Sequence, residues 1–134
     1  MTVRKAYAQG NCFDLLTGII ALSTACILIR FFNLETIIQF VRWFKQKCDR
    51  TIDQKEAWII WCTVHRAKKV LWTRIACLES SLAFILLALS KKLSADWCIG
   101  VKLAPFESHA WIEVNGSPFQ EPNNIQCFTK IFTV

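Results

Sequence analysis

The sequence has few residues that interrupt regular structure and little charge. Its 134 residues include four glycines and three prolines, and charged residues make up 19% against 54% hydrophobic ones. This scarcity of chain-breaking residues excludes collagen-like and low-complexity classes, and the low charge excludes a disordered chain or a coiled coil. Because a chain of this length suits one domain, we expect one hydrophobic core built from long regular elements.

The sequence also lacks the residue spacing of a metal site. Its seven cysteines include no pair separated by two residues, and only two histidines accompany them, His65 and His109. A structural zinc site is therefore not expected. The cysteine count is odd, and Cys26 and Cys62 lie inside apolar runs, where free thiols pack as small hydrophobic groups. This usage is typical of a reducing cytoplasm, which is the location we expect.

Acidic residues are scarce in the first half of the chain. Residues 1–74 carry a net charge of +7 and residues 75–134 a net charge of −1. The basic excess favours an acidic partner or a membrane surface, but scattered charges are also typical of a solvated helix face. The stretch His65-Arg66-Ala67-Lys68-Lys69 has the same two interpretations, docking of an acidic partner or a solvated helix end. No nucleic-acid partner is expected, because no basic and aromatic binding motif is present.

The apolar stretch near the start is short for a membrane span. Leu15–Ile29 contains fifteen residues between Asp14 and Arg30, with no small-residue cleavage site behind it. A spanning helix needs about 20 apolar residues. We therefore predict a buried core helix, and membrane anchoring through this stretch is the alternative.

Hydrophobic spacing of three and four residues predicts four helices. They are expected at residues 15–32, 34–47, 54–69 and 75–92, with a loop at 48–51. Asp53 can cap the third helix, and Glu56, three residues later, completes a capping-box pattern. The fourth helix is apolar around most of its circumference, so we expect it at the centre of the domain.

The hydrophobic period then changes from 3.6 to 2, with glycines and prolines at the breaks. This pattern predicts an antiparallel meander of strands at residues 95–102, 107–113, 117–121 and 126–132. Helices followed by an antiparallel sheet describe an α+β domain. About sixty residues scarcely build a core alone, so we expect the helical region, 1–72, and the catalytic core, 73–134, to form one domain.

Two residues in the second half of the chain, Cys77 and His109, have the chemistry of a nucleophile and its activating base. Cys77 lies in the first turn or so of the fourth predicted helix, where unpaired N–H groups and the helix dipole favour a thiolate. His109 lies on a strand of the sheet on which this helix must pack, so an imidazole can meet and activate the thiol. A buried core cysteine and a structural histidine are the alternative interpretation.

A third group should orient the imidazole. A three-residue hairpin loop, 114–116, pairs His109 with Glu121 on one face of the sheet, where the carboxylate can hold the productive tautomer. The competing loop is the two-residue Asn-Gly turn, which pairs Glu121 with Ala110 and turns it away. Glu113 shares the face of His109 but lies roughly 13 Å along the strand. We therefore favour Glu121.

Around these residues the sequence resembles the transglutaminase-like leader peptidases of lasso-peptide biosynthesis. The resemblance rests on four segments: CLESSLA at 77–83, IGV at 99–101, PFESHAWIE at 105–113 and GSP at 116–118. The His-Ala-Trp strand is shared with the wider transglutaminase-like superfamily. A chain this short resembles the free-standing protease component, with leader recognition on a separate small protein.

The resemblance implies a papain- or transglutaminase-like cysteine protease that removes the leader peptide from a ribosomally synthesised lasso-peptide precursor before macrolactam cyclisation. Cys77 matches the nucleophile and His109 the general base, and Glu121 falls where the family usually has Asp. No metal or cofactor is implied. The implied partners are the leader region of the precursor, a separate leader-recognition protein and an ATP-dependent lasso cyclase. A non-catalytic adaptor of the same fold in a peptide-maturation complex is the alternative function.

Overall fold

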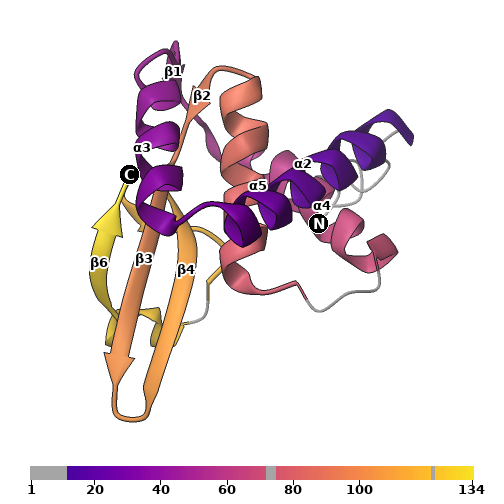
Figure 1. The fold of residues 1–134 in the computed structure, drawn as a ribbon. Coiled ribbons are helices and arrows are strands. Elements are labelled where there is room, and N and C mark those ends of the chain that lie inside the picture. The colour runs from indigo at the N-terminus through magenta and orange to yellow at the C-terminus, as the bar shows by residue number, and fades with distance from the viewer. Residues whose placement is uncertain (1–11, 72–74, 122) are drawn as a thin grey trace.

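The computed structural model describes residues 12–71, 75–121 and 123–134. Helices come first and strands follow, so the predicted α+β class is confirmed (Figure 1). The helices are α2 (Cys12–Phe31), α3 (Leu34–Lys45), α4 (Gln54–Leu71) and α5 (Cys77–Ser90). The strands are β1 (Arg50–Thr51), β2 (Leu93–Ser94), β3 (Asp96–Leu103), β4 (Phe106–Val114), β5 (Ser117–Pro118) and β6 (Thr129–Thr133), with a 3₁₀ helix, η1 (Asn123–Cys127), before β6. The predicted division of the chain at residue 72 falls outside the described residues and stays a prediction.

Helix α5 is the centre of the fold, as its apolar sequence predicts. Helix α2 and strand β4 both pack against it, and Figure 1 shows it between α2 and α4 on one side and the sheet on the other. Its buried side chains are Ser81, Leu82, Ala83, Phe84, Ile85, Leu87 and Ala88. The indole Nε1 of Trp97 on β3 donates a buried hydrogen bond of 2.9 Å to Ser81 Oγ. This bond attaches the central helix to the sheet.

Helix α2 is only partly the buried core helix that its sequence predicts. Leu22 and Ala25 are fully buried on the side that packs against α4 and α5. Four side chains on its outer side are more than half exposed: Leu16, Ile20, Ile27 and Phe31. The prediction that the whole helix is buried was therefore wrong, because the described elements pack against one side of α2. By length and composition alone α2 is also able to cross a membrane, a property that core helices and N-terminal signal sequences share.

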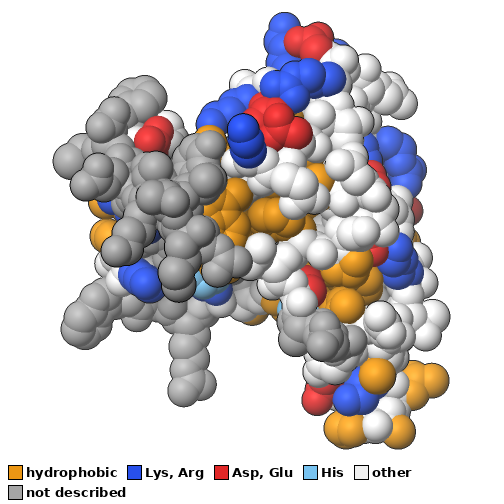
Figure 2. All heavy atoms as spheres, turned by 180° about the vertical axis from the view of Figure 1, so that it is seen from behind, with side chains coloured by type: hydrophobic (Ala, Val, Ile, Leu, Met, Phe, Trp, Pro, Cys, Tyr) orange, Lys and Arg blue, Asp and Glu red, His pale blue; other side chains and the backbone are white. Residues whose placement is uncertain are grey.

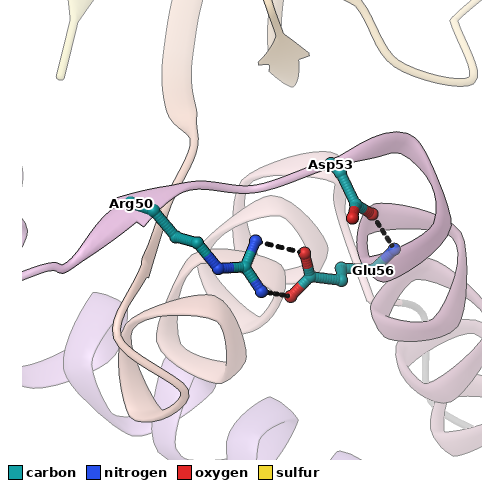
Figure 3. A network of polar contacts seen from close by, with 3 residues as sticks. All are labelled: Arg50, Asp53 and Glu56. Atoms are coloured by element: carbon teal, nitrogen blue, oxygen red, sulfur yellow. Dashed lines mark hydrogen bonds and ion pairs between the residues drawn. The ribbon is translucent and has the colours of Figure 1, made fainter.

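The start of α4 is fixed by polar contacts (Figure 3). Asp53 Oδ1 accepts a hydrogen bond of 2.8 Å from the backbone N–H of Glu56, so the predicted cap is present. The Glu56 carboxylate does not complete a capping box, because it accepts two hydrogen bonds of 2.5 and 2.7 Å from the guanidinium of Arg50. Arg50 belongs to β1, which pairs in parallel with β2 where a loop was expected. A two-residue strand is too short to show a hydrophobic period.

The main sheet is antiparallel with strand order β5-β4-β3-β6. The predicted meander was wrong at its last step, because β6 pairs with β3 rather than with β5. The chain crosses between them through η1, which takes the first part of the strand expected at 126–132. Strand β5 is also shorter than expected and ends at Pro118. Strands β3 and β4 lie in a register that places Gly100 opposite His109.

The two faces of β4 belong to different hydrophobic clusters. Ile112 and Val114 belong to the main core together with the buried residues of α5. Trp111, one residue along, belongs to a second, smaller cluster with Cys98 and Ile125. Successive side chains of a strand point to opposite faces, so the second cluster covers the face of the sheet that is turned away from α5.

The surface differs between the two ends of the molecule. Seen from behind, charged side chains gather at the upper end, while hydrophobic ones are exposed in the middle of the face and, beside a few charged ones, at the lower end (Figure 2). Figure 1 places the tip of the β3–β4 hairpin at this lower end, and its Leu103 and Phe106 are largely exposed. The hairpin therefore projects beyond the core with an apolar tip.

Candidate active site

Cys77 is the first residue of α5. The preceding Ala76 has an extended backbone and provides no side-chain cap, so the first N–H groups of the helix receive no capping hydrogen bond from it. The thiol therefore lies at the positive end of the helix dipole, beside the first N–H groups of α5. The predicted position of Cys77 at the head of the central helix is the observed one.

Cys77 lies on the wall of a cavity of about 190 Å³ between α4, α5 and β4. From α5 the wall includes Cys77, Ser80, Ser81 and Phe84, and from α4 it includes Trp61, Val64, His65 and Lys68. The remaining wall residues are Ala110, Trp111, Ile112, Phe119, Gln120 and Glu121. The cavity thus joins the candidate nucleophile to the candidate orienting acid, Glu121.

His109 and Glu121 form a direct polar contact. The imidazole Nε2 lies 2.8 Å from Glu121 Oε2, and both side chains are mostly buried. A hydrogen bond to a carboxylate at this distance holds an imidazole in one orientation and fixes its tautomer. The structure therefore brings together the histidine and the acid that the sequence analysis paired.

The register that was used to predict this pairing is wrong. The hairpin loop has two residues, Asn115 and Gly116, both with positive φ, as a type I′ turn requires. Glu113 consequently pairs with Pro118, and a straight continuation would turn Glu121 away from His109. The three-residue loop of the prediction is not formed, because Asn-Gly supplies both left-handed residues of the shorter turn.

A residue with a left-handed backbone conformation, Gln120, restores the contact between Glu121 and His109. The backbone N–H of Phe119 donates to the carbonyl of Ile112, which continues the observed register by one residue. Gln120 then takes a φ of 54°, and β5 has already ended at Pro118. This kink turns the chain so that Glu121 reaches His109. Non-glycine residues rarely adopt this conformation, and nothing in the sequence around Gln120 indicates it.

Cys77 and His109 do not touch directly. Within the described part of the chain no hydrogen bond joins them, and the imidazole lies 6.0 Å from the Trp111 ring and 5.8 Å from the Phe128 ring, measured between centroids. His109 lines a neighbouring cavity, and Glu121 lines both cavities. His109 and Cys77 are separated because side chains alternate between the two faces of β4, and His109 shares its face with Trp111.

Glu113, the other acidic residue on this strand, has different partners. Its carboxylate is only 5% exposed and lies 2.7 Å from Lys130 Nζ, and it accepts a hydrogen bond of 3.2 Å from Trp111 Nε1. This contact raises the pKa of Lys130. Burial, followed by the charge of Glu113, raises the pKa of the Cys98 thiol to about 11. Glu113 thus supports the Trp111 side of the sheet and not the imidazole.

Three cavity residues on α4 were not assigned to the site by sequence reasoning. Trp61 and His65 stack with ring centroids 4.0 Å apart, and Lys68 lies one turn further along. Burial, followed by the charges of Lys68 and Lys69, lowers the pKa of His65. The spacing 61, 65 and 68 places the three side chains on one helix face, and this spacing is the feature of the sequence from which they could have been found.

In the part of the chain that the structure describes, no group of three or more His, Cys, Asp or Glu side chains is placed to hold a metal ion.

A cysteine at the head of a central helix, packed on an antiparallel sheet that carries a histidine and a carboxylate, is the arrangement of cysteine-dependent enzymes of the papain type. The model of the transglutaminase-like superfamily matches residues 29–133, which span from the end of α2 to β6, and the chain belongs to this superfamily. Its enzymes are generally cysteine-dependent, and cysteine proteases are among them. No curated protein and no solved structure matches the chain.

Proposed function

We propose that this protein is a cysteine peptidase that removes the leader peptide from a ribosomally synthesised lasso-peptide precursor before macrolactam cyclisation. The observation that carries the proposal is the cavity that joins Cys77, at an uncapped helix start, to Glu121, which holds His109 at 2.8 Å. Membership of the superfamily supports a cysteine-dependent enzyme. The resemblance of segments 77–83 and 105–113 to leader peptidases supports the finer assignment.

In this mechanism the Cys77 thiolate adds to the carbonyl carbon at the leader–core junction. The backbone N–H of Cys77, at the head of α5, stabilises the oxyanion of the tetrahedral intermediate. The imidazolium of His109 gives its proton to the departing amine, and a thioester to Cys77 remains. Neutral His109 then takes a proton from water, the hydroxide attacks the thioester, and Cys77 leaves as a thiolate. One peptide bond is hydrolysed, and no cofactor is used.

The proton transfers require His109 to reach the Cys77 sulfur. Because Nε2 is bonded to Glu121, Nδ1 is the nitrogen that faces the thiol in this mechanism. The mechanism therefore requires the imidazole to leave the Trp111 face of β4 and swing past Glu121, which lines the cavities of both residues, toward Cys77. Catalytic hydrogen bonds commonly tighten only when substrate is bound. We expect this movement on substrate binding.

The proposed setting follows from the same resemblance. We place the reaction in the cytoplasm, with a separate leader-recognition protein that presents the leader and an ATP-dependent cyclase that consumes the core peptide. The cyclase requires the free N-terminus that hydrolysis creates, so cleavage must come first.

Substitution of the nucleophile tests the proposal. We expect Cys77→Ala to abolish cleavage of the precursor, and His109→Ala to reduce it by at least about 10²-fold because general acid–base catalysis is lost. The matched control is Cys127→Ala, since Cys127 is exposed and lies outside the cavity. Mass spectrometry of both fragments measures cleavage, and circular dichroism verifies folding. Wild-type cleavage by folded Cys77→Ala protein would contradict the proposal.

A non-catalytic adaptor is the second candidate, and the separation of Cys77 from His109 favours it. An adaptor would hold the precursor, recognition protein and cyclase together without using the thiol. It predicts that Cys77→Ala protein supports maturation as well as the wild type in a reconstituted mixture. A variant that retains complex formation but loses cleavage contradicts the adaptor.

A further inference from the structure

The α4 side of the Cys77 cavity carries a cation, Lys68, to which the described residues supply no counter-charge. Lys68 lines the cavity and is partly buried, and the described residues offer it no hydrogen bond or ion pair. Partial burial strengthens the interaction of such a group with an anion, because less water screens it. Lys68 is therefore placed to bind a negatively charged group that enters this cavity.

The one carboxylate on the described wall does not neutralise Lys68. Glu121 also lines the cavity, and its Oε2 is 2.8 Å from His109 Nε2. Burial, followed by the charges of Lys68 and Lys69, lowers the pKa of the neighbouring His65, in line with the positive charge that these lysines bring to this wall. The α4 wall thus attracts anions, while the carboxylate of Glu121 already has a hydrogen-bond partner in His109.

The shape of the wall suits a short side chain with an apolar stem. The stacked rings of Trp61 and His65 form a flat surface beside Lys68. The cavity, at about 190 Å³, is smaller than the roughly 300–1,000 Å³ of small-molecule pockets, so it suits a side chain of a peptide better than a whole ligand.

We propose that Trp61, His65 and Lys68 form a subsite for an acidic side chain of the peptide that Cys77 attacks. The methylene groups of an aspartate or glutamate pack on the Trp61–His65 stack, and its carboxylate accepts a charge-assisted hydrogen bond from Lys68 Nζ. Since the subsite shares the cavity of Cys77, this acidic residue lies close to the scissile bond. The inference deepens the proposed function and rests on it for the identity of the substrate.

Two alkylating reagents that differ by one charge test the subsite without a substrate. Iodoacetate carries a carboxylate and iodoacetamide a neutral amide of similar size, and both alkylate the same thiolate. We expect the iodoacetate-to-iodoacetamide rate ratio to be about three- to fivefold higher at Cys77 than at exposed Cys127, because a partly exposed ion pair contributes up to about 1 kcal/mol. Peptide mass spectrometry gives both rates from one sample.

Neighbouring lysines provide the matched variants. Lys68→Gln should lower the Cys77 ratio to that of Cys127, and Lys68→Arg should retain the elevated ratio. Lys69→Gln makes the same charge change at an exposed residue that does not line the cavity, and should leave most of the elevation. A change in the Cys77 pKa affects both reagents equally and cancels in the ratio, and circular dichroism verifies folding.

Three results overturn the inference: equal ratios at Cys77 and Cys127 in the wild type, equal losses in Lys68→Gln and Lys69→Gln, or a Cys77 that reacts with neither reagent. The readout does not depend on cleavage. If the elevated iodoacetate-to-iodoacetamide ratio at Cys77 is absent while precursor cleavage is intact, only the subsite is rejected. If Cys77→Ala protein cleaves the precursor as well as the wild type, the peptidase is rejected, and the anion preference at Cys77 of the wild type can still be measured.

Discussion

Helices α2 and α5 have similar apolar sequences and different surroundings. Helix α5 lies between α2 and the sheet and buries seven of its 14 residues. Helix α2 packs against α4 and α5 on one side, and its Ile20 and Phe31 on the other side are 57% and 73% exposed. A hydrophobic pattern shows which side chains avoid water, but it does not show how many neighbours are present to cover them.

The largest difference between the two helices is expected when a leucine of each is shortened to alanine. Leu82 on α5 is completely buried, so Leu82→Ala should lower the free energy of unfolding by about 2–5 kcal/mol through lost burial and a residual cavity. Leu16→Ala makes the same change on the outer side of α2 and should alter it by less than about 0.5 kcal/mol. Urea denaturation measures both values. Similar losses would mean that the outer side of α2 is covered in solution.

A smaller effect is expected from the polar attachment of α5 to the sheet. Ser81→Ala leaves the buried Trp97 Nε1 without its acceptor, which should cost about 1–3 kcal/mol of unfolding free energy. Ser90→Ala is the matched control, because Ser90 is exposed and its hydroxyl donates to the carbonyl of Leu87 within its own helix. Equal denaturation midpoints for the two variants would show that the Trp97 bond adds nothing to the attachment of α5.

The smallest expected effect is on the pH dependence of stability, and it comes from the start of α4, the helix against which α2 packs. The hydrogen bond from the Glu56 N–H lowers the pKa of Asp53. The stabilisation is therefore present above the unfolded-state pKa of about 3.9 and is lost as pH falls through the lower folded-state value. Asp53→Asn keeps a capping oxygen but removes this titration, so it should flatten the change in thermal midpoint between pH 5 and pH 2. An unchanged slope would exclude Asp53 as its source.

Local chemistry allowed much of the fold to be predicted. The four helices lie close to their expected positions, and Asp53 caps α4, because helical periods and caps involve residues a few positions apart. The pairing of β6 with β3 joins distant segments and has no local signal. The exposure of one side of α2 has none either, since it depends on which elements are left to cover that side.

The candidate site was predicted in part and for a partly wrong reason. Cys77 at the start of α5 follows from the helix pattern, and the contact between His109 and Glu121 was expected from a register that does not form. The actual contact depends on the backbone of Gln120, for which the sequence offers no indication. The α4 wall was visible as a helix face, but only the fold shows that this face meets the cysteine.

The turn at Asn115-Gly116 and the kink at Gln120 form a compensating pair. A two-residue loop with a left-handed residue at position 120 brings the acid to His109, and so does a three-residue loop followed by a straight strand. The two loops differ in whether Val114 belongs to the loop or to the strand, and this difference shifts the pairing by one residue. A change from one loop to the other must therefore be accompanied by loss or gain of the kink, so neither step alone retains the contact. Divergence at this hairpin has to proceed by coupled substitutions.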